Sequence, residues 1–126
     1  MSTTRAVLIM DDDEDVRFLV EAMFGKIGFR VDAAVDGKKA IEMYRAAYEA
    51  GTPYLAGILD LNIPGGMGGV EVAAQILAFD PRAKLFVSSG NDADPVMMAF
   101  DRYGFSGRLP KPFLYADAVA LSEQIT

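Results

Sequence analysis

Short apolar runs and helically spaced apolar stripes alternate along the whole chain. The first run stops abruptly at acidic residues, as a buried strand of a parallel sheet does. The runs cover residues 6–10, 31–35, 55–59, 85–87 and 107–109. Between them, apolar residues recur every three or four positions, which predicts amphipathic helices. The helical stripes are Val16, Leu19, Val20, Met23, Phe24 and Ile27; Ala40, Ile41, Tyr44, Ala47 and Tyr48; Val70, Ala73, Ala74 and Leu77; Val96, Ala99, Phe100 and Tyr103; and Leu114, Ala118, Leu121 and Ile125.

This alternation predicts a doubly wound α/β fold, in which five strand–helix units build a three-layer sandwich. Right-handed crossovers between parallel strands place helices on both faces of the sheet. One solution for five strands is the flavodoxin-like order 2-1-3-4-5, whose ligand crevice lies at the carboxyl ends of the first and third strands. A chain of 126 residues, 52% of them hydrophobic, can bury one core but hardly two, so we expect a single domain over residues 1–126.

Composition and charge narrow the functions open to such a domain. A net charge of −6 argues against nucleic-acid binding, which needs a basic face to meet phosphates. The chain has no cysteine, which excludes disulfides and thiolate metal sites, and no histidine, which removes the usual general base and any phosphohistidine role. No apolar run is long enough for a signal peptide or a membrane span, so we expect a cytoplasmic protein without membrane insertion.

Carboxylates follow two of the predicted strands. Asp11 and Asp12 come directly after the first run, and Asp60 comes directly after the third. If these strands are neighbours about 4.8 Å apart, the side chains converge in one shallow site. Clustered anions repel one another unless a cation neutralises them, and Mg²⁺ is the hard divalent cation that suits such oxygens. The competing interpretation is that residues 11–15 are only the solvated acidic start of a helix.

A hydroxyl and a lysine occupy the carboxyl ends of two further predicted strands. Ser89 follows the fourth run, and Lys111 lies between Pro110 and Pro112 just past the fifth. Each has an ordinary explanation alone, because serine beside glycine is common in turns and a lysine in a proline-rich turn is usually a surface residue. Together with the acids, however, they could hold the oxygens of a phosphoryl group. Their convergence at one edge of the sheet favours phosphoryl chemistry.

Five segments in order resemble the motifs of response-regulator receiver domains, the phosphoacceptor modules of two-component signalling. As a set they are highly specific, and they span essentially the whole chain. The segments are Val7-Leu-Ile-Met-Asp-Asp-Asp-Glu-Asp-Val-Arg17, Ala34-Val-Asp-Gly-Lys-Lys-Ala40, Leu59-Asp-Leu-Asn-Ile-Pro64, Val87-Ser-Ser-Gly90 and Lys111-Pro-Phe113. The resemblance implies a chemotaxis-regulator-like fold with the strand order given above.

The resemblance also implies a role for each acidic residue. Asp60 would be the nucleophile that accepts a phosphoryl group from a sensor histidine kinase, a histidine phosphotransfer protein or a small phosphodonor. Mg²⁺ or Mn²⁺ would be bound by Asp12 directly, by Asp11 through water, by Asp60, and by the backbone carbonyl of Asn62. The chain would then be a signalling phosphoacceptor that catalyses only its own phosphoryl transfer and autodephosphorylation.

In the same scheme, Ser89 and Lys111 would hold the phosphoryl oxygens. Movement of Ser89 would shift the face formed by the fourth helix, the fifth strand and the last helix, where an unidentified downstream protein would sense the state. Many family members carry a rotating aromatic residue on the fifth strand, but this chain has Arg108 there. The usual hydroxyl–aromatic coupling therefore lacks its partner, and a salt bridge of Arg108 in one state is the alternative.

The loop after Asp60 also departs from the family pattern. Residues 64–69, Pro-Gly-Gly-Met-Gly-Gly, form a glycine-rich loop that is one residue longer than usual. This loop and residues 94–97 resemble receiver modules fused to or working with sensor histidine kinases, which favours a phosphorelay partner. The loop does not resemble a nucleotide phosphate loop, because no Gly-Lys-Ser/Thr follows it.

Other functions share parts of this pattern. An aspartyl phosphohydrolase would also place Asp-x-Asp after a first strand, as Asp11 and Asp13 do, but it needs a cap and a larger core. A calcium loop would need a glycine and a glutamate where the chain has Val16 and Ala22. A flavin-binding domain shares the topology but needs a phosphate-cradling loop after the first strand. A pseudo-receiver that only binds other proteins is the remaining alternative, and the complete acid set argues against it.

Overall fold

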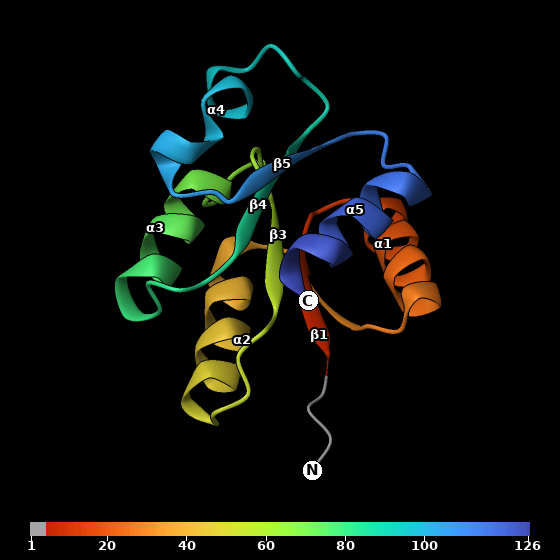
Figure 1. Ribbon diagram of the computed structural model, residues 1–126. Coiled ribbons are helices and arrows are strands. Elements are labelled where there is room, and N and C mark those ends of the chain that lie inside the picture. The colour runs from red at the N-terminus through yellow and green to blue at the C-terminus, as the bar shows by residue number, and fades with distance from the viewer. Residues whose placement is uncertain (1–4) are drawn as a thin grey trace.

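Strands and helices alternate through the whole described part of the chain, residues 5–126 of a computed structural model (Figure 1). The strands are β1 (Ala6–Met10), β2 (Arg30–Ala34), β3 (Ala56–Asp60), β4 (Leu85–Ser89) and β5 (Gly107–Pro110). The helices are α1 (Glu14–Ile27), α2 (Gly37–Glu49), α3 (Gly69–Phe79), α4 (Pro95–Met98), the 3-10 helix η1 (Phe100–Tyr103) and α5 (Tyr115–Ile125).

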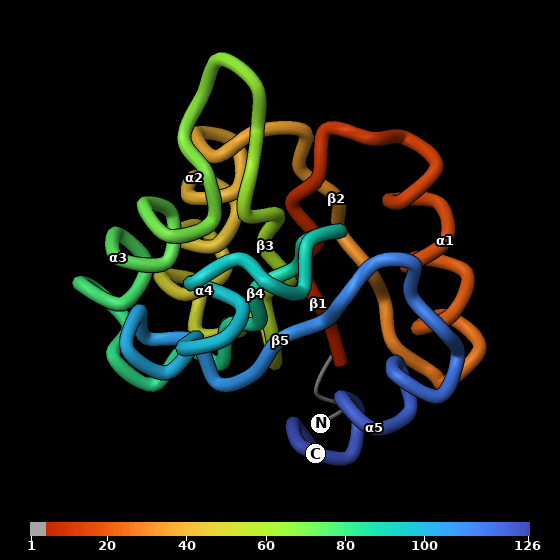
Figure 2. The backbone as a smooth tube through the Cα atoms, turned by 90° about the horizontal axis from the view of Figure 1, so that it is seen from above, coloured from red at the N-terminus to blue at the C-terminus, as the bar shows by residue number. Residues whose placement is uncertain are grey.

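The five strands form one parallel sheet in the order β2-β1-β3-β4-β5, which confirms the predicted topology. Figure 2, a view from above, shows α1 and α5 on one face of this sheet and α2, α3 and α4 on the other. The order reverses between β1 and β3, so their carboxyl ends border the crevice of a doubly wound fold.

The central strands are buried on both faces, which explains their continuous apolar runs. All residues of β1 are at most 5% exposed. Its side chains point alternately to the two faces of the sheet and pack into two hydrophobic cores, one on each side. The core under α2 and α3 includes Leu8, Met10, Tyr44, Val72 and Ile76, and the core under α1 and α5 includes Val7, Ile9, Val20, Phe24 and Leu121.

The start of α1 is set by a side-chain cap beside the carboxyl end of β1. Asp13 accepts a hydrogen bond from the amide of Asp15 at 2.9 Å and so satisfies one of the free N–H groups of the first turn. The helix ends at Gly28, whose φ of 114° lies in the left-handed region that favours glycine. These two signals orient α1 so that its first turn lies next to Asp11 and Asp12.

The predicted fourth helix is wrong as one continuous element. Its stripe has helical spacing, but the backbone leaves the helical region at Ala99 (φ −127°, ψ 45°), and η1 follows instead. The residue buried in α4 is Met97, and Tyr103 is 40% exposed rather than part of an inner face. A periodic stripe of eight residues does not reveal such a break.

Every other predicted helical face also needs correction; Leu19 of α1 and Tyr48 of α2, both expected on inner faces, are 40% and 39% exposed. The buried residues of α3 include Val72, Ala73 and Ile76, whereas the predicted Ala74 is exposed. Nearly every position of α3 is apolar, so the sequence is compatible with more than one buried face. Leu114 is also misplaced by the prediction, because it is the N-cap of α5 and is 62% exposed.

Candidate functional site

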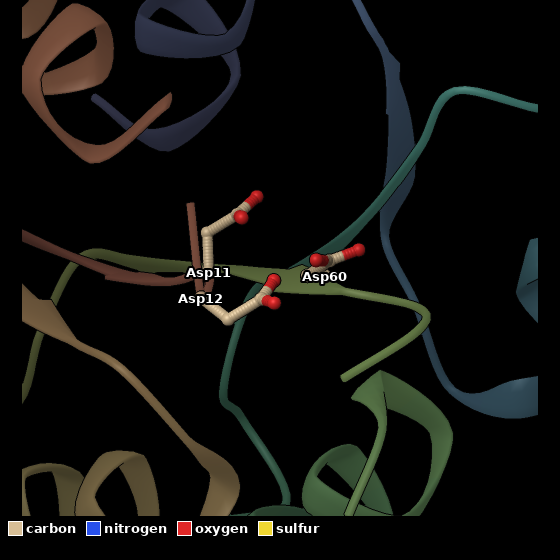
Figure 3. A group of neighbouring side chains, drawn as sticks. All are labelled: Asp11, Asp12 and Asp60. Atoms are coloured by element: carbon tan, nitrogen blue, oxygen red, sulfur yellow. The ribbon is translucent and has the colours of Figure 1, made fainter. Parts of the chain in front are cut away.

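Three carboxylates meet where β1 and β3 end. Asp11 follows β1, Asp12 comes next, and Asp60 is the last residue of β3 (Figure 3). Each offers one oxygen, and these oxygens all lie within 4.8 Å of one another. Asp11 and Asp60 are 1% and 5% exposed, whereas Asp12 is exposed. The convergence predicted from the strand ends is therefore present.

Lys111 reaches across the strand ends to two of these acids. Its Nζ lies 2.8 Å from Oδ2 of Asp11 and 3.5 Å from Oδ2 of Asp60. The backbone amide of Lys111 donates to the carbonyl of Ser89 at 2.9 Å, which ties this segment to the end of β4. The Lys111–Pro112 peptide bond is cis. One lysine thus partly neutralises three acids, and the cluster keeps a net negative charge.

Burial and charge set the protonation of the site. Burial, and then the charge of Asp11, raise the pKa of Asp60 from its ordinary 3.8 to about 6, although Lys111 and the amide of Asn62 act against this rise. Burial alone would lower the pKa of Lys111, but its contacts with Asp11 and Asp60 outweigh that effect and raise it. At neutral pH the site therefore holds an ionised Asp60 beside a protonated lysine.

The oxygen atoms of this acidic cluster are suitable ligands for a hard divalent cation. Oδ1 of Asp11 accepts a hydrogen bond from the amide of Asp13 at 2.9 Å. Its Oδ2 is buried and, apart from the ion pair with Lys111, has no hydrogen-bond partner among residues 5–126. A buried anionic oxygen that is paired with Lys111 alone among residues 5–126 is stabilised by a further cation, and carboxylate oxygens are the ligands that Mg²⁺ prefers. The backbone carbonyl of Asn62 remains a predicted ligand.

Ser89 lies at the same edge, but its hydroxyl contacts none of the acids in this structure. The side chain is buried, and Oγ accepts a hydrogen bond from the amide of Asn91 at 3.1 Å. This arrangement leaves the hydroxyl proton free to donate to another group. It also links Ser89 to the start of the loop that leads to α4.

A second serine was missed by the sequence reasoning. Ser88 pairs in register with Asp60, so both side chains point to the same face of the sheet. Its Oγ is fully buried and has no hydrogen-bond partner in the described part of the chain. The available signal was a serine at an alternating position inside a buried strand, where an apolar residue is the usual choice.

The glycine-rich loop after Asp60 folds back over the end of β3. A Cβ on Gly68 would overlap the carbonyl oxygen of Leu61, and a Cβ on Gly69 would lie 2.9 Å from the carbonyl oxygen of Asp60. Only glycine permits this approach of backbone to backbone. The loop lines a cavity of about 400 Å³ together with Leu61 and Asn62, the two residues that follow Asp60.

Arg108 occupies the outer strand β5 and contacts the backbone of α4. Its Nη1 lies 3.5 Å from the carbonyl oxygen of Met97. Among the described side chains it forms no ion pair in this structure. The guanidinium therefore connects β5 to α4, although by a carbonyl contact rather than by the salt bridge considered from the sequence.

Comparisons with known proteins agree with this geometry. A family model described as the response regulator receiver domain matches residues 7–123. The transcriptional regulatory protein PrrA of Mycobacterium tuberculosis is 34% identical over 94% of this chain, which corresponds to 48% of PrrA. The chemotaxis protein CheY of Thermotoga maritima is 27% identical over 86% of this chain and 87% of its own length. The chain thus spans about half the length of PrrA and most of CheY.

Solved structures share the fold. Chemotaxis protein CheY4 of Vibrio cholerae superposes with a TM-score of 0.84 at 21% identity, over 98% of this chain and 99% of its own. The receiver domain of sensor histidine kinase PA1611 from Pseudomonas aeruginosa PAO1 superposes with a TM-score of 0.82 at 21% identity, over 96% of both chains. The structure of that domain has a magnesium ion coordinated in its active-site cleft. Within residues 5–126, no helix is long and apolar enough to cross a bilayer. This chain belongs to the response regulator receiver domain family of two-component systems.

Proposed function

We propose that the chain is a phosphoacceptor of a two-component or phosphorelay pathway and that Asp60 takes up the phosphoryl group in a reaction that needs Mg²⁺. The observation that carries this proposal is the convergence of buried Asp60 with Asp11, Asp12 and Lys111 at one edge of the sheet. The magnesium ion in the receiver domain of PA1611 supports the choice of cation.

The residues divide the chemistry among them. A carboxylate oxygen of Asp60 attacks phosphorus, and the bond from phosphorus to the donor nitrogen or oxygen breaks as the acyl phosphate forms. With a pKa of about 6, Asp60 is ionised and nucleophilic at neutral pH. Mg²⁺ or Mn²⁺, held by Asp11, Asp12, Asp60 and the carbonyl of Asn62, would neutralise charge on the phosphoryl oxygens.

Lysine and hydroxyl complete the phosphoryl site. Lys111 already lies 3.5 Å from Asp60, so its ammonium group can pair with a phosphoryl oxygen after a small movement. The hydroxyl placed to donate to another phosphoryl oxygen is that of Ser88, which lies on the same face of the sheet as Asp60 and has no hydrogen-bond partner among residues 5–126. Ser89, the residue expected from the sequence, alternates to the opposite face of β4. Because the amide of Asn91 donates to Oγ of the adjacent Ser89, a movement of the end of β4 toward the phosphoryl group carries the loop before α4 with it. The face of α4, β5 and α5 would thereby report the state to a downstream protein.

The donor is a histidine-bearing partner, a sensor histidine kinase or a histidine phosphotransfer protein. The chain has no histidine, so it accepts phosphoryl groups but does not pass them on as phosphohistidine. Beside the acids, an apolar groove of about 340 Å³ is lined by Val16, Leu19, Pro112 and Phe113 together with Asp15 and Lys111. An apolar groove next to the reacting residues, with Leu19 40% exposed in its wall, suits a helix that presents a phosphohistidine.

Uptake of phosphoryl groups from acetyl phosphate tests the proposal without a cognate partner. The wild-type protein, incubated with acetyl phosphate and Mg²⁺, should gain one labile phosphoryl adduct by intact mass spectrometry. The adduct should be absent without Mg²⁺ and absent from Asp60→Asn. Asp101→Asn removes an exposed carboxylate from η1 and should behave as the wild type. If the folded wild-type protein forms no adduct and binds no Mg²⁺, the chain is a pseudo-receiver and the proposal is wrong.

A further inference from the structure

Arg17 makes a contact that the proposed chemistry does not use. It lies in the first turns of α1 and is half-buried, and its Nη1 donates to the backbone carbonyl of Asp11 at 2.8 Å. The amide of Arg17 also donates to the carbonyl of Asp13 at 3.1 Å. Although acidic side chains surround this turn, Arg17 forms no ion pair with any residue from 5 to 126. Its guanidinium is therefore committed to the backbone rather than to a carboxylate.

The carbonyl that Arg17 holds belongs to the peptide that joins Asp11 to Asp12. The plane of this peptide sets ψ of Asp11 and φ of Asp12, and so it sets the direction in which the second carboxylate leaves the chain. Asp11 is also held by burial and by the amide of Asp13. Asp12 is exposed, so packing does not hold its side chain. The hydrogen bond from Arg17 is thus a restraint on the position of Asp12 relative to Asp11.

We propose that Arg17 is a positioning residue for the divalent cation, acting through the Asp11–Asp12 peptide without touching the metal. This inference rests on the proposed function. A ligand pair held in place before the cation arrives loses less conformational entropy on binding, and outer contacts of this kind change metal affinity by about 10–100-fold. Removal of the Arg17 side chain should therefore weaken Mg²⁺ binding by about ten-fold or more.

The sign of the effect separates positioning from electrostatics. A guanidinium near a metal site repels a divalent cation, so a residue that acted through charge alone would bind Mg²⁺ more tightly once its charge was removed. Positioning predicts weaker binding in Arg17→Met, which loses both charge and hydrogen bond. Arg17→Lys keeps the charge but lacks the planar donor fork, so it should also bind Mg²⁺ more weakly than the wild type.

Isothermal titration with Mg²⁺ and urea unfolding without metal provide the test. A matched control is Arg82→Met, which removes the same charge from the exposed turn between α3 and β4, at the opposite edge of the sheet. We expect the dissociation constant for Mg²⁺ to rise about ten-fold or more in both Arg17 variants and to stay unchanged in the control. Unfolding in the absence of metal shows whether each variant is folded when it is titrated.

Phosphorylation by acetyl phosphate gives a second readout. In Arg17→Met, the Mg²⁺ concentration that gives half the maximal rate should rise about ten-fold, while the rate at saturating Mg²⁺ should approach that of the wild type. Unchanged or tighter Mg²⁺ binding by the folded variant would overturn the role of Arg17, and so would a reduced maximal rate with an unchanged Mg²⁺ requirement. If the wild type itself binds no Mg²⁺, the proposed function fails together with this inference.

Discussion

Replacement of Asp60 by asparagine should stabilise the protein when no metal is present. The folded protein holds the Asp60 carboxylate among buried groups and beside Asp11, and this environment raises its pKa from 3.8 to about 6. A raised carboxyl pKa means that ionisation costs more in the folded protein than in the unfolded chain. Asparagine has nearly the same shape and no charge. Lys111 remains paired with Asp11 at 2.8 Å in the variant, so no buried cation is left alone.

The magnitude follows from the pKa of Asp60. Each pKa unit corresponds to about 1.4 kcal/mol, so a rise from 3.8 to about 6 corresponds to about 3 kcal/mol. Between these two values the folded protein binds more protons than the unfolded chain, so the wild type loses stability as the pH rises through this window. Below pH 3.8 the penalty is absent, and above pH 6 it is complete. The advantage of Asp60→Asn is therefore about 3 kcal/mol at pH 7.5 and roughly half of that at pH 5.

Urea unfolding followed by far-ultraviolet circular dichroism measures this difference. Wild type, Asp60→Asn and the control Asp101→Asn would be compared at pH 7.5 and pH 5 with a chelator present. With a urea slope of about 1–3 kcal/mol per molar, a difference of 3 kcal/mol moves the midpoint by about 1–3 M. A less stable Asp60→Asn at pH 7.5, or an advantage of equal size at both pH values, would refute the reasoning.

Other substitutions test single contacts by the free energy of unfolding. Ser88→Ala removes a buried hydroxyl without a partner, so it should raise that free energy by about 1 kcal/mol; a loss would show that the hydroxyl is satisfied. Tyr44→Phe removes the buried hydrogen bond to Asp80 at 2.8 Å and should lower the free energy of unfolding by about 1–3 kcal/mol. Gly68→Ala should lower the free energy of unfolding by about 1–3 kcal/mol, because the added Cβ overlaps the backbone carbonyl of Leu61. Gly66→Ala, whose Cβ has space, should change the free energy of unfolding by less than about 1 kcal/mol.

The strands could be predicted because their physical signal is local, whereas their order followed from the topology of doubly wound folds and from the resemblance to receiver domains. A central strand of a parallel sheet is buried on both faces, so it appears in the sequence as an apolar run. The end of the strand can be located where acidic residues or glycine follow that run. Asp11 and Asp60 could be placed from those strand ends alone. The parallel topology then brings the ends together, which is why residues 49 positions apart share one site.

The contacts that the sequence did not predict depend on neighbours in space. The Ser88 hydroxyl has no hydrogen-bond partner among residues 5–126 because the neighbouring strands and helices place no donor or acceptor within hydrogen-bonding reach of it. The local sequence around Ser88 does not contain this information. The hydrogen bond from Arg17 to the Asp11 carbonyl requires the exact turn between β1 and α1. The break at Ala99 is likewise a tertiary feature, because the stripe across it keeps helical spacing.

Locating the phosphoryl group tests the central claim most directly. The protein would be phosphorylated with acetyl phosphate and Mg²⁺, treated with borohydride to reduce the acyl phosphate to an alcohol, digested and mapped by tandem mass spectrometry. The account predicts reduction at residue 60 alone, with conversion of that aspartate to homoserine. Reduction at Asp11 or Asp12, or no reduction at any residue in a folded and phosphorylated sample, would contradict it.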